Sequence, residues 1–297
     1  MYISKYNGSK VKQMTHYAEL AVTTNFSFLR AASHPAELVA TAEALGLSAI
    51  GIADRNSFAG MVRAFEEWKK RKAVRLLVGT RLVTHDGFEV LAYPTDRKAY
   101  GRLCRLLTQG NLKAKKGACH ITFEDIVAAS EGQMLIALPG EELSFPRKRE
   151  PIIRDLAKMA YGSQLSPGRP APVHFTDRLA ALAQAAPGRC FLAGVYHYRG
   201  DEPRRLGLLA ELGEHTGAPL VAVNDVHYHV QERRVLADVL TCIREKCTVR
   251  TPASGSRSMR SAISRRRTRW RGCSRAIPTR SHAAWRSPTP ARFRSSS

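Results

Sequence analysis

"PAELVATAEALGLSAIGIAD", residues 35–54, places a helix pattern directly before a strand pattern. Leu38, Ala42 and Leu45 recur at helical spacing, and Pro35 fits the first turn of a helix, where no amide hydrogen is needed. The run "AIGIAD" that follows is short and apolar, which is typical of a buried strand. A strand that follows a helix in this way predicts one unit of an α/β fold.

The same order repeats along the chain. Strand patterns lie at 17–22, 75–83, 88–94, 133–140, 190–198 and 219–225, and helix patterns at 58–73, 98–111, 177–188, 203–217 and 232–247, with Gly110 expected to stop its helix. A weaker helical pattern lies at 151–162. The alternation predicts one α/β domain over residues 17–249 with mostly parallel strands, after a flexible leader, 1–16.

The charge of the chain is unevenly distributed. The formal net charge is +22, but residues 250–297 contain thirteen arginines and eleven serines without lysine, aspartate or glutamate. We expect this segment to be a disordered basic tail, so the folded part is only mildly basic. Three origins fit it: a nucleic-acid-binding arm, a phosphorylatable Arg/Ser segment, or out-of-frame translation of a GC-rich gene. Arginine without lysine or acid favours a frameshift.

Several classes of protein find no support. The six cysteines are irregularly spaced and form neither a zinc-finger pattern nor a disulfide framework, so we expect reduced thiols in the cytoplasm. No apolar run is long enough for a membrane span. Phosphate-binding glycine loops and the nucleophile elbow of serine hydrolases are also missing from the sequence.

Long stretches of the sequence carry a family resemblance. They are "YAELAVTTNFSFLRAASHPAELVATAEALGLSAIGIADRNSFAGMVRA" (17–64), "LLVGTRL" (76–82), "AYPTDRKAYGRLCRLLTQGN" (92–111), "KGACHITFEDI" (116–126) and "PLVAVNDVHYHVQERRVLADVLTCIREKCTV" (219–249). In this order they resemble the N-terminal PHP (polymerase and histidinol phosphatase) domain of bacterial DNA polymerase III alpha subunits, and most closely the error-prone branch. The resemblance covers about residues 15 to 249.

That resemblance implies a fold and a context. The fold would be a distorted seven-stranded (β/α) barrel, with any metal cluster at the carboxyl ends of its strands. The family role would be DNA-directed DNA synthesis across lesions in damage-induced mutagenesis, replication and repair, with Mg²⁺ in the full-length polymerase. Partners would be the rest of the polymerase chain, DNA, other mutagenesis proteins and the sliding clamp. The polymerase palm lies outside these 297 residues, so we expect no stand-alone polymerase activity.

The resemblance also identifies metal-ligand positions. Working PHP domains use His, Asp and Glu side chains to hold two or three metal ions. The first motif, normally His-x-His, falls on Glu19 and Ala21, and only Glu19 could still bind a metal. The second, normally Asp-His, reads Asp54-Arg55, and we expect Arg55 to form a salt bridge with Asp54 in place of a metal.

Other ligand positions have changed too. The strand 75–83 has Arg81 where the family has a glutamate, and its neighbour, near Phe88, lacks the usual histidine. Ala193 replaces another glutamate, and His197 is a weak candidate on the same strand. His85 and Asp86 lie in "THDG", which a hairpin turn explains.

The last motif, Asp225-x-His227, is intact. Residues two apart on a strand share a face, so both side chains should point to one side. Asp54, Asp225, His227 and Glu19 are therefore candidate vestigial ligands, while Arg55 and Arg81 would replace metal charge. Like-charge repulsion from these two arginines argues against a multinuclear site.

Three hypotheses follow. The first is a degenerate, structural PHP domain of a truncated error-prone polymerase, with no catalytic residues and no cofactor. The second is a metal-dependent phosphoesterase or 3′-5′ exonuclease that uses Zn²⁺ or Mn²⁺. The third is a small protein that binds DNA through its basic tail. The basic loops at 113–117 and 147–150 fit ordinary solvated surface or, as in a polymerase, contacts to the DNA backbone.

Overall fold

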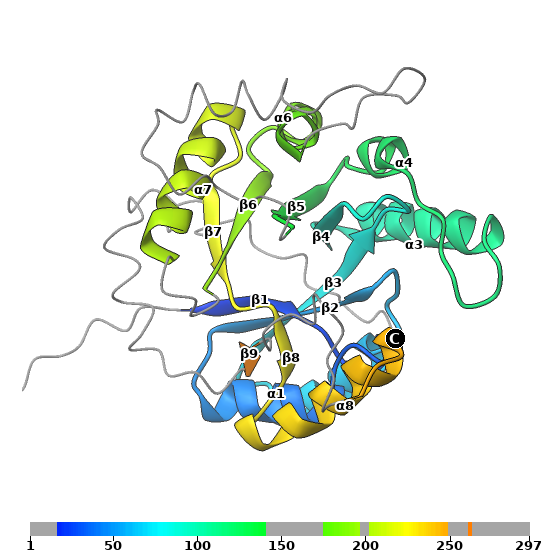
Figure 1. Ribbon diagram of the computed structural model, residues 1–297, viewed down its shortest axis with the longest axis vertical. Helices are drawn as coiled ribbons and strands as arrows, with labels where there is room; N and C mark the ends of the chain where they lie inside the picture. Colours follow the sequence, from blue (N-terminus) through cyan, green and yellow to red (C-terminus); the bar gives the residue numbers. More distant parts are fainter. Residues whose placement is uncertain (1–16, 141–174, 197–201, 249–260, 263–297) are drawn as a thin grey trace, which may run out of the picture.

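The computed structural model describes residues 17–140, 175–196, 202–248 and 261–262 (Figure 1). Predictions for the leader 1–16, the helical pattern at 151–162, the loop at 147–150, His197 and most of the tail fall outside these residues. Within them, the predicted alternation of strands and helices is confirmed, with bounds that differ by a few residues.

The strands of the described residues form one sheet, in the order β7-β6-β5-β4-β3-β2-β1-β8-β9. They are β1 (Ala18–Val22), β2 (Ala49–Arg55), β3 (Arg75–Val83), β4 (Glu89–Pro94), β5 (Gln133–Leu138), β6 (Cys190–Val195), β7 (Leu220–Val223), β8 (Val226–Tyr228) and β9 (Ser261–Ala262). Two pairings are antiparallel, β3 with β4 and β4 with β5, and the other pairings are parallel. The expectation of mostly parallel strands is confirmed.

β7, at one end of this sheet order, and β8, next to the other end, are adjacent in the chain. β7 pairs with β6, and β8 pairs with β1, although only Asn224 and Asp225 separate β7 from β8. The backbone turns between them because Asp225 adopts a left-handed conformation with φ of 49°, which aspartate tolerates better than most residues. The segment 220–228 therefore acts as a broken seventh strand, and the sheet curls as the predicted distorted barrel requires.

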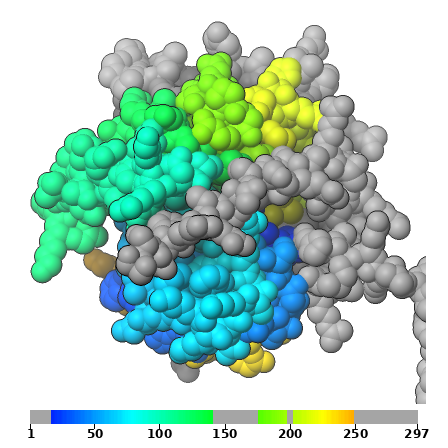
Figure 2. Space-filling view, turned by 180° about the vertical axis from the view of Figure 1, so that it is seen from behind, coloured from blue at the N-terminus to red at the C-terminus, as the bar shows by residue number. Residues whose placement is uncertain are grey.

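Helices cover the outer face of the curled sheet in two groups. They are α1 (Pro35–Ala44), α2 (Met61–Arg71), α3 (Arg97–Leu112), α4 (Phe123–Ala128), α6 (Phe175–Ala185), α7 (Glu202–Thr216) and α8 (Arg234–Glu245), with the short 3-10 helix η1 (Gln231–Arg233) before α8. α1 and α2 pack with β1, β2 and β3, whereas α3, α4, α6 and α7 pack with β4 to β7. From behind, Figure 2 shows the same division, with most blue and cyan residues in one half and the green to yellow-green residues in the other, while gold residues lie at the edge of the blue half.

The inside of the curled sheet is closed by a tyrosine. Tyr93 on β4 is buried, its ring lies over Gly79 of β3, and its hydroxyl donates to the carbonyl of Leu20 on β1. A Cβ on Gly79 would come within 2.3 Å of the ring. The absent side chain is thus what allows the tyrosine to cross the interior from one strand to another.

The sequence suggested that Gly110 stops its helix, and the structure shows that it does not. α3 continues to Leu112, and a Cβ on Gly110 would lie 2.8 Å from Cys119 Sγ. The amide of His120 also donates to the Gly110 carbonyl at 2.9 Å. Gly110 is needed because the segment 119–121 packs directly on the helix backbone, a role that the local sequence pattern cannot distinguish from helix termination.

Two residues of the arginine-rich tail are described. Ser261 and Ala262 form β9 beside β8. No helix in the described part of the chain is both long and apolar enough to cross a membrane.

Candidate functional site

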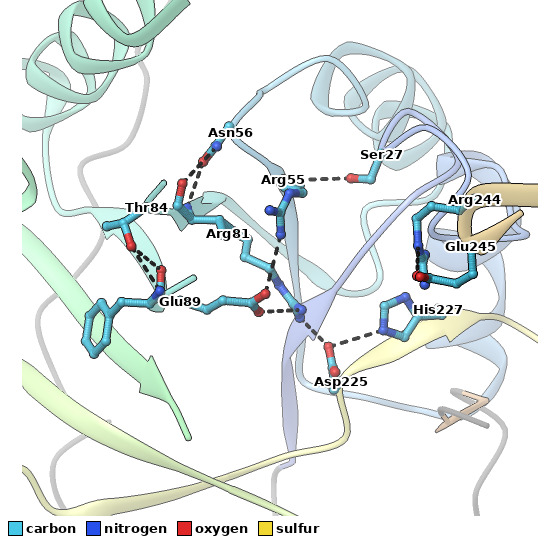
Figure 3. A network of polar contacts seen from close by, with 12 residues as sticks. Ser27, Arg55, Asn56, Arg81, Thr84, Glu89, Asp225, His227, Arg244 and Glu245 are labelled. Carbon is cyan, nitrogen blue, oxygen red and sulfur yellow. Dashed lines mark hydrogen bonds and ion pairs between the residues drawn. The ribbon is translucent and has the colours of Figure 1, made fainter. Parts of the chain in front are cut away.

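The predicted ligand Asp225 is bound by an arginine. Arg81 reaches it from β3 and donates through Nη2 to Asp225 Oδ1, and the two side chains are only 6% and 9% exposed. Burial by itself would lower the pKa of Arg81, but the charges of Asp225 and Glu89 raise it above its usual value. Arg81 is therefore a firmly held cation beside the carboxylate that a metal would need (Figure 3).

Glu89 joins the two arginines that the sequence singled out. Its carboxylate lies 3.3 Å from Arg81 Nη1 and 3.4 Å from Arg55 Nη1. Sequence reasoning did not identify Glu89 as part of the site. The signal was the hairpin, since antiparallel pairing sets Glu89 opposite Val83 and hence diagonal to Arg81 on the neighbouring strand.

His227 lies beside Asp225, as the two-residue spacing predicts. Its Nε2 is 3.4 Å from Asp225 Oδ1, and its Nδ1 lies 3.0 Å from the carbonyl oxygen of Arg30. The carbonyl can only accept, so Nδ1 carries the hydrogen in this contact. The imidazole thus connects β8 to the loop that follows β1, and Figure 3 shows its other contact, with Asp225.

The Asp54 carboxylate accepts hydrogen bonds from backbone amides and a hydroxyl, and it does not pair with an arginine of the described residues. It accepts hydrogen bonds from the Thr24 amide at 2.9 Å, from the Ser27 hydroxyl at 2.7 Å and from the Gly60 amide at 3.2 Å. The expected salt bridge to Arg55 is wrong. Successive strand residues point to opposite faces, so Arg55 turns away to Glu89 while Asp54 holds the loop after β1 and the start of α2.

Glu19 holds the closure of the sheet. Its carboxylate accepts from the Asn224 side-chain amide at 2.7 Å, from the Asn224 backbone amide at 3.2 Å and from the Tyr17 hydroxyl at 2.8 Å. Burial raises the pKa of Glu19 despite these hydrogen bonds, which act in the opposite direction. The side chain connects β1 to the end of β7, so its donors already occupy the oxygens that a metal would bind.

At the other family ligand positions, apolar side chains are packed in the core. Ala21 and Ala193 are fully buried in the interior apolar cluster that also contains Leu91, Tyr93 and Val195. Phe88 belongs instead to the outer core.

The "THDG" segment forms the turn between β3 and β4, as predicted. The Gly87 amide donates to the Thr84 carbonyl, and Asp86 pairs with Arg178. Hydrogen bonding to Arg178 lowers the pKa of Asp86 to about 2. A turn with its own ion pair accounts for Asp86 without a metal.

Two further arginines lie at the same end of the sheet. Arg244 of α8 donates to the Leu29 carbonyl at 3.0 Å and pairs with Glu245 at 2.9 Å. Arg30 is half-buried, and its pKa is lowered to about 10 by burial and then by the charges of Arg55 and Arg244. Positive charge is therefore concentrated where the resemblance places metal ions.

The described residues do not fit a metal cluster. Across the described ranges, no three His, Cys, Asp or Glu side chains come together in a way that could hold an ion. Asp54 and Glu19 have their oxygens occupied by backbone and side-chain donors, and Asp225 is bound by Arg81. The four predicted ligands thus separate into three different arrangements, and only Asp225 and His227 remain in contact.

The fold and the family match together define the class of the domain. Residues 19–147 match the model of the PHP domain, and the curled sheet with its helical cover is of the PHP type. The chain contains a PHP domain that matches the N-terminal fifth of error-prone DNA polymerases.

Three relatives illustrate the extent of this match. The error-prone DNA polymerase of Caulobacter vibrioides is 47% identical over 234 residues, which is 78% of this chain and 19% of the relative. Those of Rhodopseudomonas palustris and Brucella abortus are 43% and 42% identical over 254 and 241 residues, which cover 78% and 80% of this chain and 22% and 20% of theirs. The chain therefore spans about a fifth of the length of the curated relatives it matches.

Similarity to solved structures is weaker. A protein described as a metal-dependent phosphoesterase from Bifidobacterium adolescentis is 14% identical with a TM-score of 0.48, covering 72% of this chain and 88% of that one. An amidohydrolase from Chromobacterium violaceum is 13% identical with a TM-score of 0.46, covering 88% and 96%.

Proposed function

We propose that this chain is the PHP portion of an error-prone DNA polymerase and that its role there is structural. The observation that carries the proposal is the buried pair of Arg81 and Asp225, because a cation occupies the carboxylate that a metal would need. The other candidate ligands hold the fold together: Asp54 fixes a loop and Glu19 fixes the closure of the sheet. The parent activity would be DNA synthesis across lesions during damage-induced mutagenesis.

An exposed helix face supports a structural role. Val235, Val239 and Ile243 lie on one side of α8 at helical spacing, and all three side chains are exposed to solvent. In the curated relatives the part outside the match is about four times as long as the matched segment, and α8 is the last helix that the structure describes here. We infer that the rest of the polymerase chain packs on this face, where it would remove apolar surface from water.

The metal part of the proposal is tested on the purified full chain. Metal analysis should find Zn²⁺ and Mn²⁺ far below one ion per chain, and hydrolysis of a model phosphodiester or of a DNA 3′ end should be the same in Asp225→Asn as in the native chain. At least one tightly bound ion per chain, with hydrolysis lost in Asp225→Asn, would instead establish the phosphoesterase or exonuclease.

The structural part is tested by complementation between fragments. The remaining four fifths of the Caulobacter vibrioides polymerase, produced separately, should associate with this chain. Val239→Glu should abolish the association, whereas Val62→Glu, at an exposed apolar position on α2, should not. Equal binding by the two variants would show that α8 is not the contact.

A further inference from the structure

Three of the arginine groups at this end of the sheet have carboxylate partners. Arg81 pairs with Asp225 and with Glu89, and Arg55 shares Glu89 at 3.4 Å. One carboxylate thus serves two guanidinium groups.

Arg244 of α8 uses the third carboxylate. It pairs with Glu245, its neighbour in the chain (Figure 3), and also donates to the Leu29 carbonyl. Its second contact ties α8 to the loop 25–31, on which Arg30 lies.

Arg30 is left without such a partner. Its guanidinium lies close enough to those of Arg55, Arg81 and Arg244 for their charges to act on it, and the Glu89 carboxylate, which Arg55 and Arg81 already share, opposes them only in part. Within the described part of the chain, no carboxylate forms an ion pair with Arg30. Four guanidinium groups therefore face three carboxylates, and the excess positive charge is concentrated on one half-buried side chain.

The backbone that carries Arg30 is anchored. Its carbonyl oxygen contacts His227 Nδ1, its amide donates to the Ser27 carbonyl at 3.0 Å, and Arg244 holds the preceding residue, Leu29. Leu29 adopts a left-handed backbone conformation, with φ of 57°, which these contacts maintain. A cation on an anchored loop is preorganised for a ligand, because little conformational freedom remains to be lost on binding.

We propose that this end of the barrel binds a phosphate group of single-stranded DNA, with Arg30 as the main contact and Arg55 and Arg244 beside it. A phosphodiester carries one negative charge, which matches the excess of one guanidinium group, and guanidinium groups bind phosphate oxygens through paired hydrogen bonds. This site goes beyond the proposed structural function and does not depend on it.

The same loop offers surface for bases. Phe26 and Phe28 are exposed, Phe28 to 81%, which is unusual for an aromatic side chain outside an interface. Unpaired bases stack on such rings without regard to sequence, while neighbouring cations hold the backbone. The combination favours single-stranded DNA over a free phosphate ion as the ligand.

The test is fluorescence anisotropy of a labelled oligothymidylate with the full chain, across a series of salt concentrations. Arg30→Gln should weaken binding several-fold and reduce the slope of log affinity against log salt by about 0.7, the value for one lost contact to a single strand. Arg105→Gln, at an exposed position on α3, is the matched control and should change both much less. The basic tail contributes equally to these variants, so their difference reports the site.

Three outcomes would overturn the proposal. Equal effects of Arg30→Gln and Arg105→Gln on DNA binding would show that Arg30 contributes only through the net positive charge of the chain and not through a specific site. A lower melting temperature in Arg30→Gln would assign Arg30 a structural role, since removing an unpaired cation from like charges should leave stability unchanged or higher. Competition by inorganic phosphate together with unaltered binding by Phe28→Ala would identify free phosphate, and not DNA, as the ligand.

Discussion

Arg81 and Asp225 are 144 positions apart in the chain and form a buried ion pair across the interior of the curled sheet. β3 supplies the arginine, and the break between β7 and β8 supplies the aspartate. The pair therefore links the middle of the sheet to the turn between β7 and β8. A charge that has been removed from water stabilises a fold only while its partner is present, and the first prediction follows from this.

Arg81→Met should destabilise the chain strongly. It removes the guanidinium from the buried Asp225 carboxylate, and breaking a buried pair on one side costs about 3–5 kcal/mol. Arg55→Met, which removes a side chain that is 31% exposed, should cost about 1 kcal/mol or less. Chemical denaturation of the two variants gives the comparison. Similar losses would mean that the Arg81 pair is no stronger than a surface ion pair.

The Tyr93 ring sets the tolerance of its neighbours for added volume. Gly79→Ala should lower the free energy of unfolding by about 1–3 kcal/mol, because the new Cβ would overlap the ring. Tyr93→Leu introduced together with Gly79→Ala should recover part of the loss, since the two sites are in contact and their effects are not additive.

Gly101→Ala is the matched control for this pair. Gly101 lies within α3, and a Cβ there would meet nothing within 4 Å. The substitution should stabilise the chain by about 0.5–1 kcal/mol, because alanine favours a helix interior. Thermal unfolding of the three variants would refute the packing argument if Gly79→Ala and Gly101→Ala moved stability in the same direction.

The elements that follow local rules could be predicted from the sequence. Hydrophobic periodicity and the glycine and proline residues between elements identified the strands and helices. The spacing of Asp225 and His227 placed their side chains together. Both properties depend on a few neighbouring residues. The predicted ion pair between Asp54 and Arg55 does not form, although their charges are opposite. Neighbouring residues on a strand point to opposite faces of the sheet, so the two side chains cannot meet.

Contacts that depend on tertiary structure could not be predicted in the same way. Glu89 joins the site only through the register of a hairpin, and Arg30 and Arg244 meet because α8 returns to the loop after β1. Nothing in a short window of sequence distinguishes these arginines from the other basic residues of the chain.

The buried carboxyl of Glu19 should leave a signature in the pH dependence of stability. Its pKa is raised in the fold, so its contribution to stability is fully present below the pKa of an ordinary glutamate and is lost as pH rises through the raised value. Relative to Glu19→Gln, the native chain should therefore lose stability from about pH 4 upward. Denaturation at several pH values measures this, with Glu124→Gln, an exposed position on α4, correcting for the loss of one carboxylate. An unchanged difference across this range would contradict the raised pKa.

The position of Arg81 between Asp225 and Glu89 leads to a prediction about metal binding. The family resemblance places a glutamate at this position, and in this chain the arginine contacts both Asp225 and Glu89. Arg81→Glu would bring three carboxylates together and remove the buried cation between Asp225 and Glu89, leaving only Arg55 beside Glu89, so the variant should be less stable than the native chain in the absence of metal. Mn²⁺ binds such oxygen ligands, and a ligand that binds only the folded state raises stability by about 2.7 kcal/mol at one hundred times its dissociation constant.

Melting temperatures with and without Mn²⁺ test this idea directly. The native chain should not respond, because Arg81 repels a second cation from Asp225, whereas Arg81→Glu should gain stability as Mn²⁺ is added. Arg81→Met removes the same positive charge without adding a carboxylate, and its response should be smaller. If the two variants respond equally, loss of the arginine charge alone explains the gain, and position 81 does not lie where a metal would bind.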